Sequence, residues 1–241
     1  DKYGARHFHF TDESYPPALF RKLTRGLIDS KMGIAWTTHM RFEKSLLEDQ
    51  VWQDAKASGC KYLHFGYESG NERVLKLMDK ATTTEIMTKH LKYTAEAGIW
   101  NHCMGFFGFP GETREEAWSS VEFLEQNKDY VHSLGFGTFD LGRHNPVAKH
   151  PEKFGVTAYK NPEWDLALDY YFTVKQGLSI EEAERVFEEF ERNHNPGWDL
   201  RLFIREYIFL YIAQFGLQKL PDLQFRSARV ATVPPSLAGK M

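Results

Sequence analysis

The chain has 241 residues, of which 42% are hydrophobic and 15% aromatic, enough for the core of one large domain or of one domain with an appendage. Its net charge of −3 argues against a nucleic-acid backbone or an anionic membrane as the main partner, and no apolar run approaches the about 20 residues of a spanning helix. We therefore expect a cytoplasmic protein. The chain begins at Asp1, shortly before a predicted strand, so we also expect it to be part of something longer.

Five short apolar, aromatic and β-branched runs predict the strands of a parallel sheet. Their starts lie 27, 28, 38 and 33 residues apart, which is the length of a strand, a helix and two loops rather than of a hairpin. Such a repeat favours right-handed crossovers. The predicted strands are 7–10, 34–40, 62–67, 100–109 and 133–141.

Amphipathic patterns between these runs predict the crossover helices. A pair of prolines opens the first helix, and glycines or polar caps mark the ends of the others. The predicted helices are 16–31, 45–58, 71–78, 84–97 and 113–130. Together with the strands they fill residues 1–141, which are predicted to form one parallel region of about five strand–helix units.

The pattern changes after residue 141. Residues 142–164 contain three prolines among histidines and lysines, which predicts an ordered active-site loop without regular structure. Residues 165–220 are predicted to be a helical C-terminal region with helices at 165–175, 180–193 and 198–214. Residues 221–241 read as a loosely ordered tail.

In a parallel sheet with helical crossovers, ligands bind at the carboxyl ends of the strands, so the residues that follow each strand are candidates. The fourth strand ends in two close glycines and a proline, a turn that lets the backbone approach a ligand. The polar candidates at the other strand ends are Asp12, Glu13, His39, Arg41, Glu68, Ser69, Asn71, Asp140, Arg143 and His144.

These candidates have structural explanations as well. Asp12, Glu13, Ser69 and Asn71 are plausible helix caps or loop residues. Glu68 ends a run that should be largely buried, and a buried carboxylate needs a partner or a ligand. Arg41 could be that partner in an internal ion pair, or it could bind a substrate carboxylate through its planar guanidinium.

The histidines and cysteines inside the strands favour packing over metal binding. We expect His7, His9, His64 and His102 to lie in the core. Cys60 and Cys103 are too few for a disulfide framework and lack the clustered spacing of a structural metal site, so they are predicted to be small core residues.

Several runs together resemble the radical S-adenosylmethionine (SAM) enzymes, particularly the branch that carries a cobalamin-binding domain. Their order and spacing match over residues 5–156. The matching runs are Phe10-Thr11-Asp12-Glu13, residues 36–43, Phe65-Gly66-Tyr67-Glu68-Ser69-Gly70-Asn71 with residues 74–80, Gly108-Phe109-Pro110-Gly111-Glu112-Thr113, and Asn145-Pro146 with residues 150–155.

The resemblance implies an α/β fold, a parallel partial (βα) barrel with about five of the family's six units present here. The family's first unit carries a C-x-x-x-C-x-x-C loop whose thiolates hold a 4Fe-4S cluster. Neither Cys60 nor Cys103 matches that loop. The resemblance therefore implies cluster ligands in a missing N-terminal segment of the same protein, and no metal ligands in this chain. The strand at 7–10 would then be an uncovered sheet edge.

The resemblance also implies roles for single residues. Asp12 and Glu13 occupy the segment that holds the methionine amino group of SAM, and Arg41 would face the methionine carboxylate. Glu68 and Ser69 would contact methionine or ribose groups. The adenine would be bordered by Phe107, Gly108, Phe109 and Pro110, and the substrate, a small molecule or a peptide, is expected near His39, Asp140, Arg143 and His144.

Three hypotheses about function stay open at this point. The first is the catalytic-domain portion of an enzyme that generates a 5′-deoxyadenosyl radical or performs cobalamin-linked methyl transfer. The second is a degenerate barrel that binds a nucleoside-like ligand without catalysis. The third is an unrelated barrel enzyme with Glu68 or Asp140 as general base and Arg41 as an electrostatic clamp.

Overall fold

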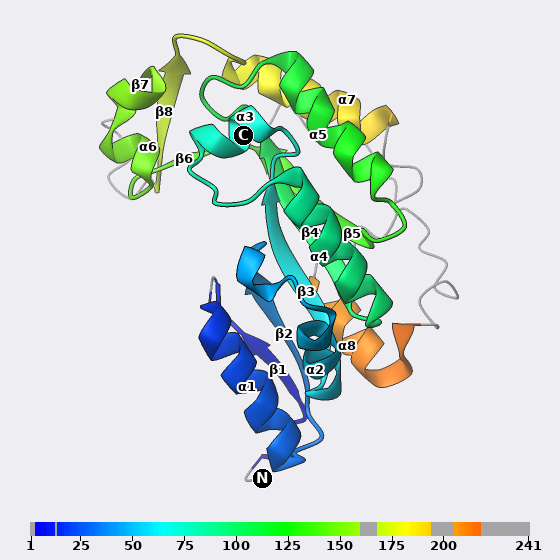
Figure 1. Cartoon of the computed structure of the whole chain (residues 1–241). Helices are drawn as coiled ribbons and strands as arrows, with labels where there is room; N and C mark the ends of the chain where they lie inside the picture. The colour runs from blue at the N-terminus through cyan, green and yellow to red at the C-terminus, as the bar shows by residue number, and fades with distance from the viewer. Residues whose placement is uncertain (1–2, 13, 160–167, 194–204, 218–241) are drawn as a thin grey trace, which may run out of the picture.

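The structure is a computed structural model that describes residues 3–12, 14–159, 168–193 and 205–217. Its main sheet has five parallel strands in chain order, which confirms the predicted parallel architecture (Figure 1). Among the described strands, the first lies at one edge of the sheet, as expected. The strands are β1 (His7–Phe10), β2 (Ala35–Met40), β3 (Cys60–Glu68), β4 (Trp100–Phe107) and β5 (Ser133–Thr138).

The crossover helices form where the sequence predicts them, and the last three of the five begin with polar capping side chains. The Asn71 side chain accepts hydrogen bonds from the amides of Arg73 and Val74, and Thr113 forms a capping box with Glu116. The segment predicted as one helix at 45–58 divides into a short 3-10 turn, η1, and a helix, α2. The bounds are α1 (Pro17–Ser30), η1 (Lys44–Leu46), α2 (Asp49–Ala57), α3 (Glu72–Leu77), α4 (Thr84–Glu96) and α5 (Arg114–Gln126).

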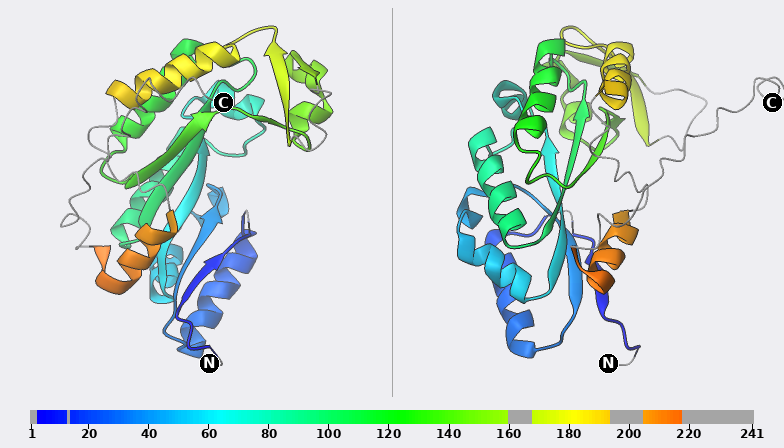
Figure 2. Two further views of the ribbon diagram at one scale, coloured as in Figure 1. Left: turned by 180° about the vertical axis from the view of Figure 1, so that it is seen from behind. Right: turned by 90° about the vertical axis from the view of Figure 1, so that its right-hand side faces the viewer.

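Successive side chains along each strand point to opposite sides of the main sheet, so its two faces carry different residues. Trp36, Phe65 and Cys103 pack under α1, α2 and α4, which with α5 cover one face (Figure 2). The opposite face carries Tyr62 and Trp100, and α8 (Arg205–Phe215) packs on its lower part. We call this the inner face of the sheet. Above α8 it extends to the carboxyl ends of the strands.

The segment after β5 differs from its prediction. Residues 142–164 were expected to lack regular structure and 165–175 to be helical, but an antiparallel sheet forms in the order β6-β8-β7. In β8, Phe172 is buried against Val156 and Leu141, so its aromatic and β-branched residues follow a period of two rather than a helical period. The elements are β6 (Leu141–Gly142), α6 (Pro146–Lys149), η2 (Pro151–Phe154), β7 (Val156–Tyr159) and β8 (Asp169–Val174).

The last helices follow their predictions where the structure describes them. The helix predicted at 180–193 is α7 (Ile180–Asn193), which packs on β5 and α5 (Figure 1). The helix predicted at 198–214 corresponds to α8, but residues 198–204 and the predicted tail at 221–241 lie outside the described residues. Within the described ranges, no helix has the length and apolar character needed to cross a membrane.

Candidate active site at the strand ends

Glu68 ends β3 and forms an ion pair with Lys80. The Lys80 Nζ lies 2.9 Å from Glu68 Oε1, and the two side chains are 31% and 21% exposed. The alternative pairing of Glu68 with Arg41 is wrong, because Arg41 is 49% exposed and lies 3.8 Å from Glu43. The carboxylate thus has a protein partner and still reaches solvent at the strand end.

The backbone around this pair is unusual. Glu68 has a φ of +61° and Asp79, next to Lys80, a φ of +55°, a region that costs a residue with a Cβ about 1–2 kcal/mol. The pairing of β3 with β4 shifts register between Gly66 and Glu68. A Cβ on Gly66 would lie 2.9 Å from Glu68 Oε1, so this glycine leaves the space that the carboxylate occupies. Such local strain is typical of functional sites.

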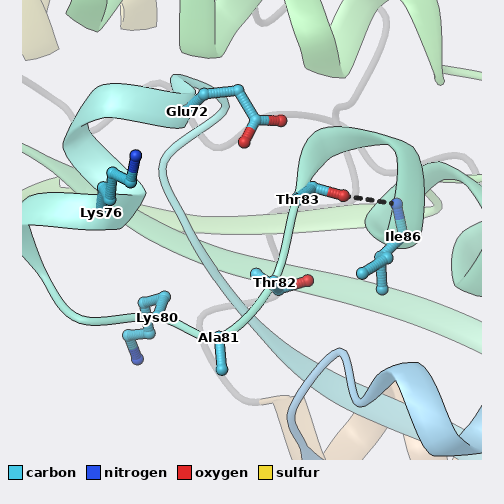
Figure 3. Close-up of a pocket in the computed structure, with 7 residues that line it drawn as sticks. All are labelled: Glu72, Lys76, Lys80, Ala81, Thr82, Thr83 and Ile86. Carbon is cyan, nitrogen blue, oxygen red and sulfur yellow. Dashed lines mark hydrogen bonds between the residues drawn. The ribbon is translucent and has the colours of Figure 1, made fainter.

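Lys80 also lines a pocket of about 360 Å³ between α3 and α4 (Figure 3). Lys76 and Thr83 line the same pocket, and the Thr83 hydroxyl accepts a hydrogen bond from the Ile86 amide. The buried hydroxyl of Thr82 has no hydrogen-bond partner among the described residues. Lys80 therefore lies between this pocket and the end of β3.

Four histidines form a row across the inner face of β1 to β4. The ring of His39 stacks on that of His64 at 4.6 Å, His9 lies 5.5 Å from both, and His102 meets His64 edge to face at 5.5 Å. The spacing follows from the separation of neighbouring strands. His64 and His102 are buried, in agreement with the predicted packing role, but His9 is only partly buried and His7 is exposed, so the core prediction is wrong for His7. His39 lies nearest to the predicted substrate side at the end of β2.

Glu112 follows the glycine-proline turn after β4, among the polar groups that the sequence places at the strand ends, and its carboxyl is buried. Its Oε2 accepts a hydrogen bond from the Gly108 amide at 2.6 Å, and its Oε1 has no partner among the described residues. Burial raises the pKa of Glu112 to about 7, an effect that the Gly108 hydrogen bond opposes. The signal in the sequence was an acidic residue directly after the Gly-Phe-Pro-Gly turn.

The turn after β4 is covered by protein. A Cβ on Gly108 would lie 2.5 Å from the Cβ of Ala183 in α7, and the Leu178 amide donates to the Glu112 carbonyl at 2.8 Å. Phe107 is completely buried against Phe190. All four residues predicted to border adenine, Phe107, Gly108, Phe109 and Pro110, are buried in this packing.

The remaining predicted residues lie in different surroundings. Asp12 is exposed and accepts a hydrogen bond from the Tyr15 hydroxyl at 3.0 Å, whereas Glu13 lies outside the described residues. Ser69 is fully buried, and its hydroxyl pairs with that of Ser120 at 2.9 Å.

Asp140 lies between β5 and β6, and Arg143 and His144 lie between β6 and α6. Partial burial and the nearby Asp169 raise the pKa of Asp140. His144 is exposed. These residues share one segment, and their predicted contact with substrate stays a prediction.

The two cysteines do not suit an iron–sulfur cluster. Both are completely buried, and burial raises the pKa of Cys60 to about 12 and that of Cys103 further, which disfavours the thiolates that bind iron. Within the described ranges there is no group of three or more histidine, cysteine or acidic residues that could hold a metal ion. The cysteines are core residues, as predicted.

A sequence signature of the Radical SAM superfamily matches residues 2–124, half of the chain. The chain belongs to this superfamily. Members of this superfamily use SAM with a 4Fe-4S cluster, and the match confirms the resemblance seen in the sequence.

Curated relatives of this superfamily member include methyltransferases. Cytidylyl-2-hydroxyethylphosphonate methyltransferase of Streptomyces wedmorensis is 27% identical over 213 residues, covering 83% of this chain and 38% of the relative. Bacteriochlorophyllide d C-12(1)-methyltransferase of Chlorobaculum tepidum is 26% identical over 173 residues, covering 68% and 35%. The chain thus spans less than two fifths of the length of these relatives.

Solved structures show the same fold. The radical SAM methyltransferase TsrM from Kitasatospora setae, with cobalamin and a [4Fe-4S] cluster bound, has a TM-score of 0.57 at 18% identity and covers 77% of this chain and 38% of its own. Coproporphyrinogen III oxidase (HemN) from Escherichia coli, a radical SAM enzyme, has a TM-score of 0.54 at 15% identity and covers 78% and 39%. These likenesses confirm the radical SAM type of barrel.

Proposed function

We propose that this chain is the SAM-binding portion of a radical SAM methyltransferase. The observation that carries the proposal is the Glu68–Lys80 pair, which holds a partly exposed carboxylate at the end of β3 in a Radical SAM fold. Ligands of such folds bind at the carboxyl ends of the strands. The methyltransferase names of two relatives support methyl transfer as the reaction class.

This chain's residues would bind and orient SAM. Glu68 would accept hydrogen bonds from donor groups of the cofactor, and Arg41, half exposed near the end of β2, would bind the methionine carboxylate. Asp12 follows the neighbouring strand and would accept from the methionine ammonium. With its cluster, SAM supplies a carbon-centred radical or a methyl group, and the protein supplies orientation and exclusion of water.

The cluster ligands would come from another segment of the same protein, because Cys60 and Cys103 do not fit that role. The substrate, a small molecule or a peptide, would approach between the inner-face histidine row and the segment with Asp140 and Arg143. Cobalamin is bound by TsrM, which makes it a candidate second cofactor here.

The test is turnover by the full-length protein after anaerobic cluster reconstitution. Reductant and SAM are added with and without cobalamin, and the products are separated by liquid chromatography with mass detection. We expect 5′-deoxyadenosine, S-adenosylhomocysteine or both, at a rate at least tenfold lower in Glu68→Gln and unchanged in Lys92→Met, a surface control. Iron-free protein that forms the same products from SAM in air would contradict the proposal.

A further inference from the structure

We propose that Lys80 is a positioning residue for SAM binding, which acts by fixing the carboxylate of Glu68. This inference rests on the proposed function, in which Glu68 contacts SAM. Lys80 holds Glu68 Oε1 at 2.9 Å, and no described residue donates a hydrogen bond to Oε2. One oxygen is therefore held by the protein and the other is left for a ligand.

A glutamate at the end of a strand needs such a restraint. Its side chain has several rotatable bonds, and a ligand that must order them loses part of its binding free energy. The glycine at position 66 lets the carboxylate lie against β3, and the charged hydrogen bond from Lys80 keeps it there. The bound geometry of Glu68 is thereby prepared before the ligand arrives.

Lys80 is itself held at its backbone. Its amide donates to the Leu75 carbonyl at 2.9 Å, and Asp79 turns the chain after α3 through its left-handed conformation. Of the three non-glycine residues with positive φ in the described ranges, Glu68 is one and the immediate neighbour of Lys80 is another. Both ends of the pair therefore depend on backbone conformations that few residues adopt.

Lys76 provides a matched control. It lines the same pocket as Lys80 and is exposed, but it forms no ion pair in the part of the chain that the structure describes (Figure 3). Its replacement changes the charge of the pocket by the same amount without touching Glu68. General electrostatic attraction of SAM by the pocket would be reduced equally by loss of either lysine.

SAM has three kinds of group that donate hydrogen bonds to a carboxylate: the ribose hydroxyls, the adenine amino group and the methionine ammonium. 5′-Methylthioadenosine carries the ribose and the adenine without the ammonium, so it separates the ammonium from the other two. If Glu68 Oε2 binds the ribose or the adenine, loss of Lys80 weakens 5′-methylthioadenosine and SAM alike. If it binds the ammonium, only SAM is weakened. Both results support a positioning role and differ in the group positioned.

The test is a double-mutant cycle in SAM affinity, measured by equilibrium dialysis of the cluster-loaded full-length protein with labelled SAM. We expect Lys80→Met and Glu68→Gln each to weaken binding about tenfold, and the double variant to bind no more weakly than Glu68→Gln alone. Lys80→Arg restores most of the affinity, and Lys76→Met stays within about twofold of wild type. Melting temperature and cluster absorbance verify that each variant is folded and loaded.

Two results would overturn the inference while leaving the proposed function intact. In one, Lys80→Met binds SAM like wild type although Glu68→Gln binds weakly. In the other, the two effects multiply to about a hundredfold, which means that the residues act separately. A wild-type protein that binds no SAM would overturn the proposed function, and this inference with it.

Discussion

Glu112 accepts a hydrogen bond from the Gly108 amide through one carboxyl oxygen and buries the other without a partner. Burial raises its pKa from 4.5 to about 7. Between these pH values the folded chain holds a proton that the unfolded chain releases, so stability is full below about pH 4.5 and falls as the pH rises to 7. Linkage gives a loss of about 3 kcal/mol over this window.

Glu112→Gln should remove this pH dependence, because the amide keeps the acceptor for Gly108 and has no charge to bury. Urea unfolding at pH 5 and pH 8 measures the difference in the free energy of unfolding. Glu115→Gln, at an exposed position of the same helix start, should keep the wild-type difference. If Glu112→Gln lost as much stability as wild type between the two pH values, the buried-acid explanation would be wrong.

Gly108→Ala should destabilise the protein by about 3 kcal/mol. The backbone at Gly108 has a φ of +85°, and a Cβ would lie 2.5 Å from Ala183, so the strain of the left-handed region adds to a clash with α7. Gly137→Ala is the control, since a Cβ there meets nothing within 4 Å. The denaturant midpoints of the Gly108→Ala and Gly137→Ala variants measure the difference in stability. Equal midpoints would show that α7 does not pack on the turn as described.

Arg41→Ala should weaken SAM binding about tenfold while changing the free energy of unfolding by less than about 1 kcal/mol. The side chain is half exposed and 3.8 Å from Glu43, so its ion pair contributes little to stability. Arg25→Ala, which removes the surface pair with Asp54, should leave SAM affinity unchanged. Unaltered SAM affinity in Arg41→Ala would remove Arg41 from the proposed site.

Replacing Cys60 and Cys103 together by alanine should leave the iron and sulfide content of the reconstituted full-length protein unchanged. Both thiols are fully buried, and burial raises their pKa values, so neither is available as a thiolate ligand. Metal analysis compares the iron content of the double variant with that of the wild-type protein, and circular dichroism compares their secondary structure. Loss of iron from a variant with native secondary structure would show that at least one of these cysteines binds the cluster.

The sequence predicted the main sheet well because each strand is a short apolar run and amphipathic helices separate the strands. Each of β1 to β5 overlaps its predicted run, and Asn71 and Thr113 cap α3 and α5 as expected. These signals are local, since a cap and a short apolar run are complete within a few residues.

The small sheet was missed because its signals depend on contacts between distant residues. The strand β8 is stabilised by pairing with β6 and β7, and Phe172 is buried only when those strands are in place. The contact between Gly108 and Ala183 also joins residues that lie far apart in the sequence, 75 positions from each other. Proline-rich composition alone predicted a loop where antiparallel pairing gives short strands.

The Glu68–Lys80 pair was missed for a related reason. The sequence offered Arg41 on the neighbouring strand as the nearest cation, whereas the left-handed turn at Asp79 brings Lys80 back to the end of β3. Lys80 stands only 12 residues after Glu68 in the sequence, but its side chain reaches Glu68 only because of that turn.

The proposed function depends on the binding of SAM by Glu68 at the end of β3. A crystal structure of the cluster-loaded full-length protein with SAM tests it most directly. We predict a ribose hydroxyl or the methionine ammonium within about 3.2 Å of Glu68 Oε2, with Lys80 still bonded to Oε1. SAM bound with neither group in hydrogen-bond reach of Glu68 would contradict the claim.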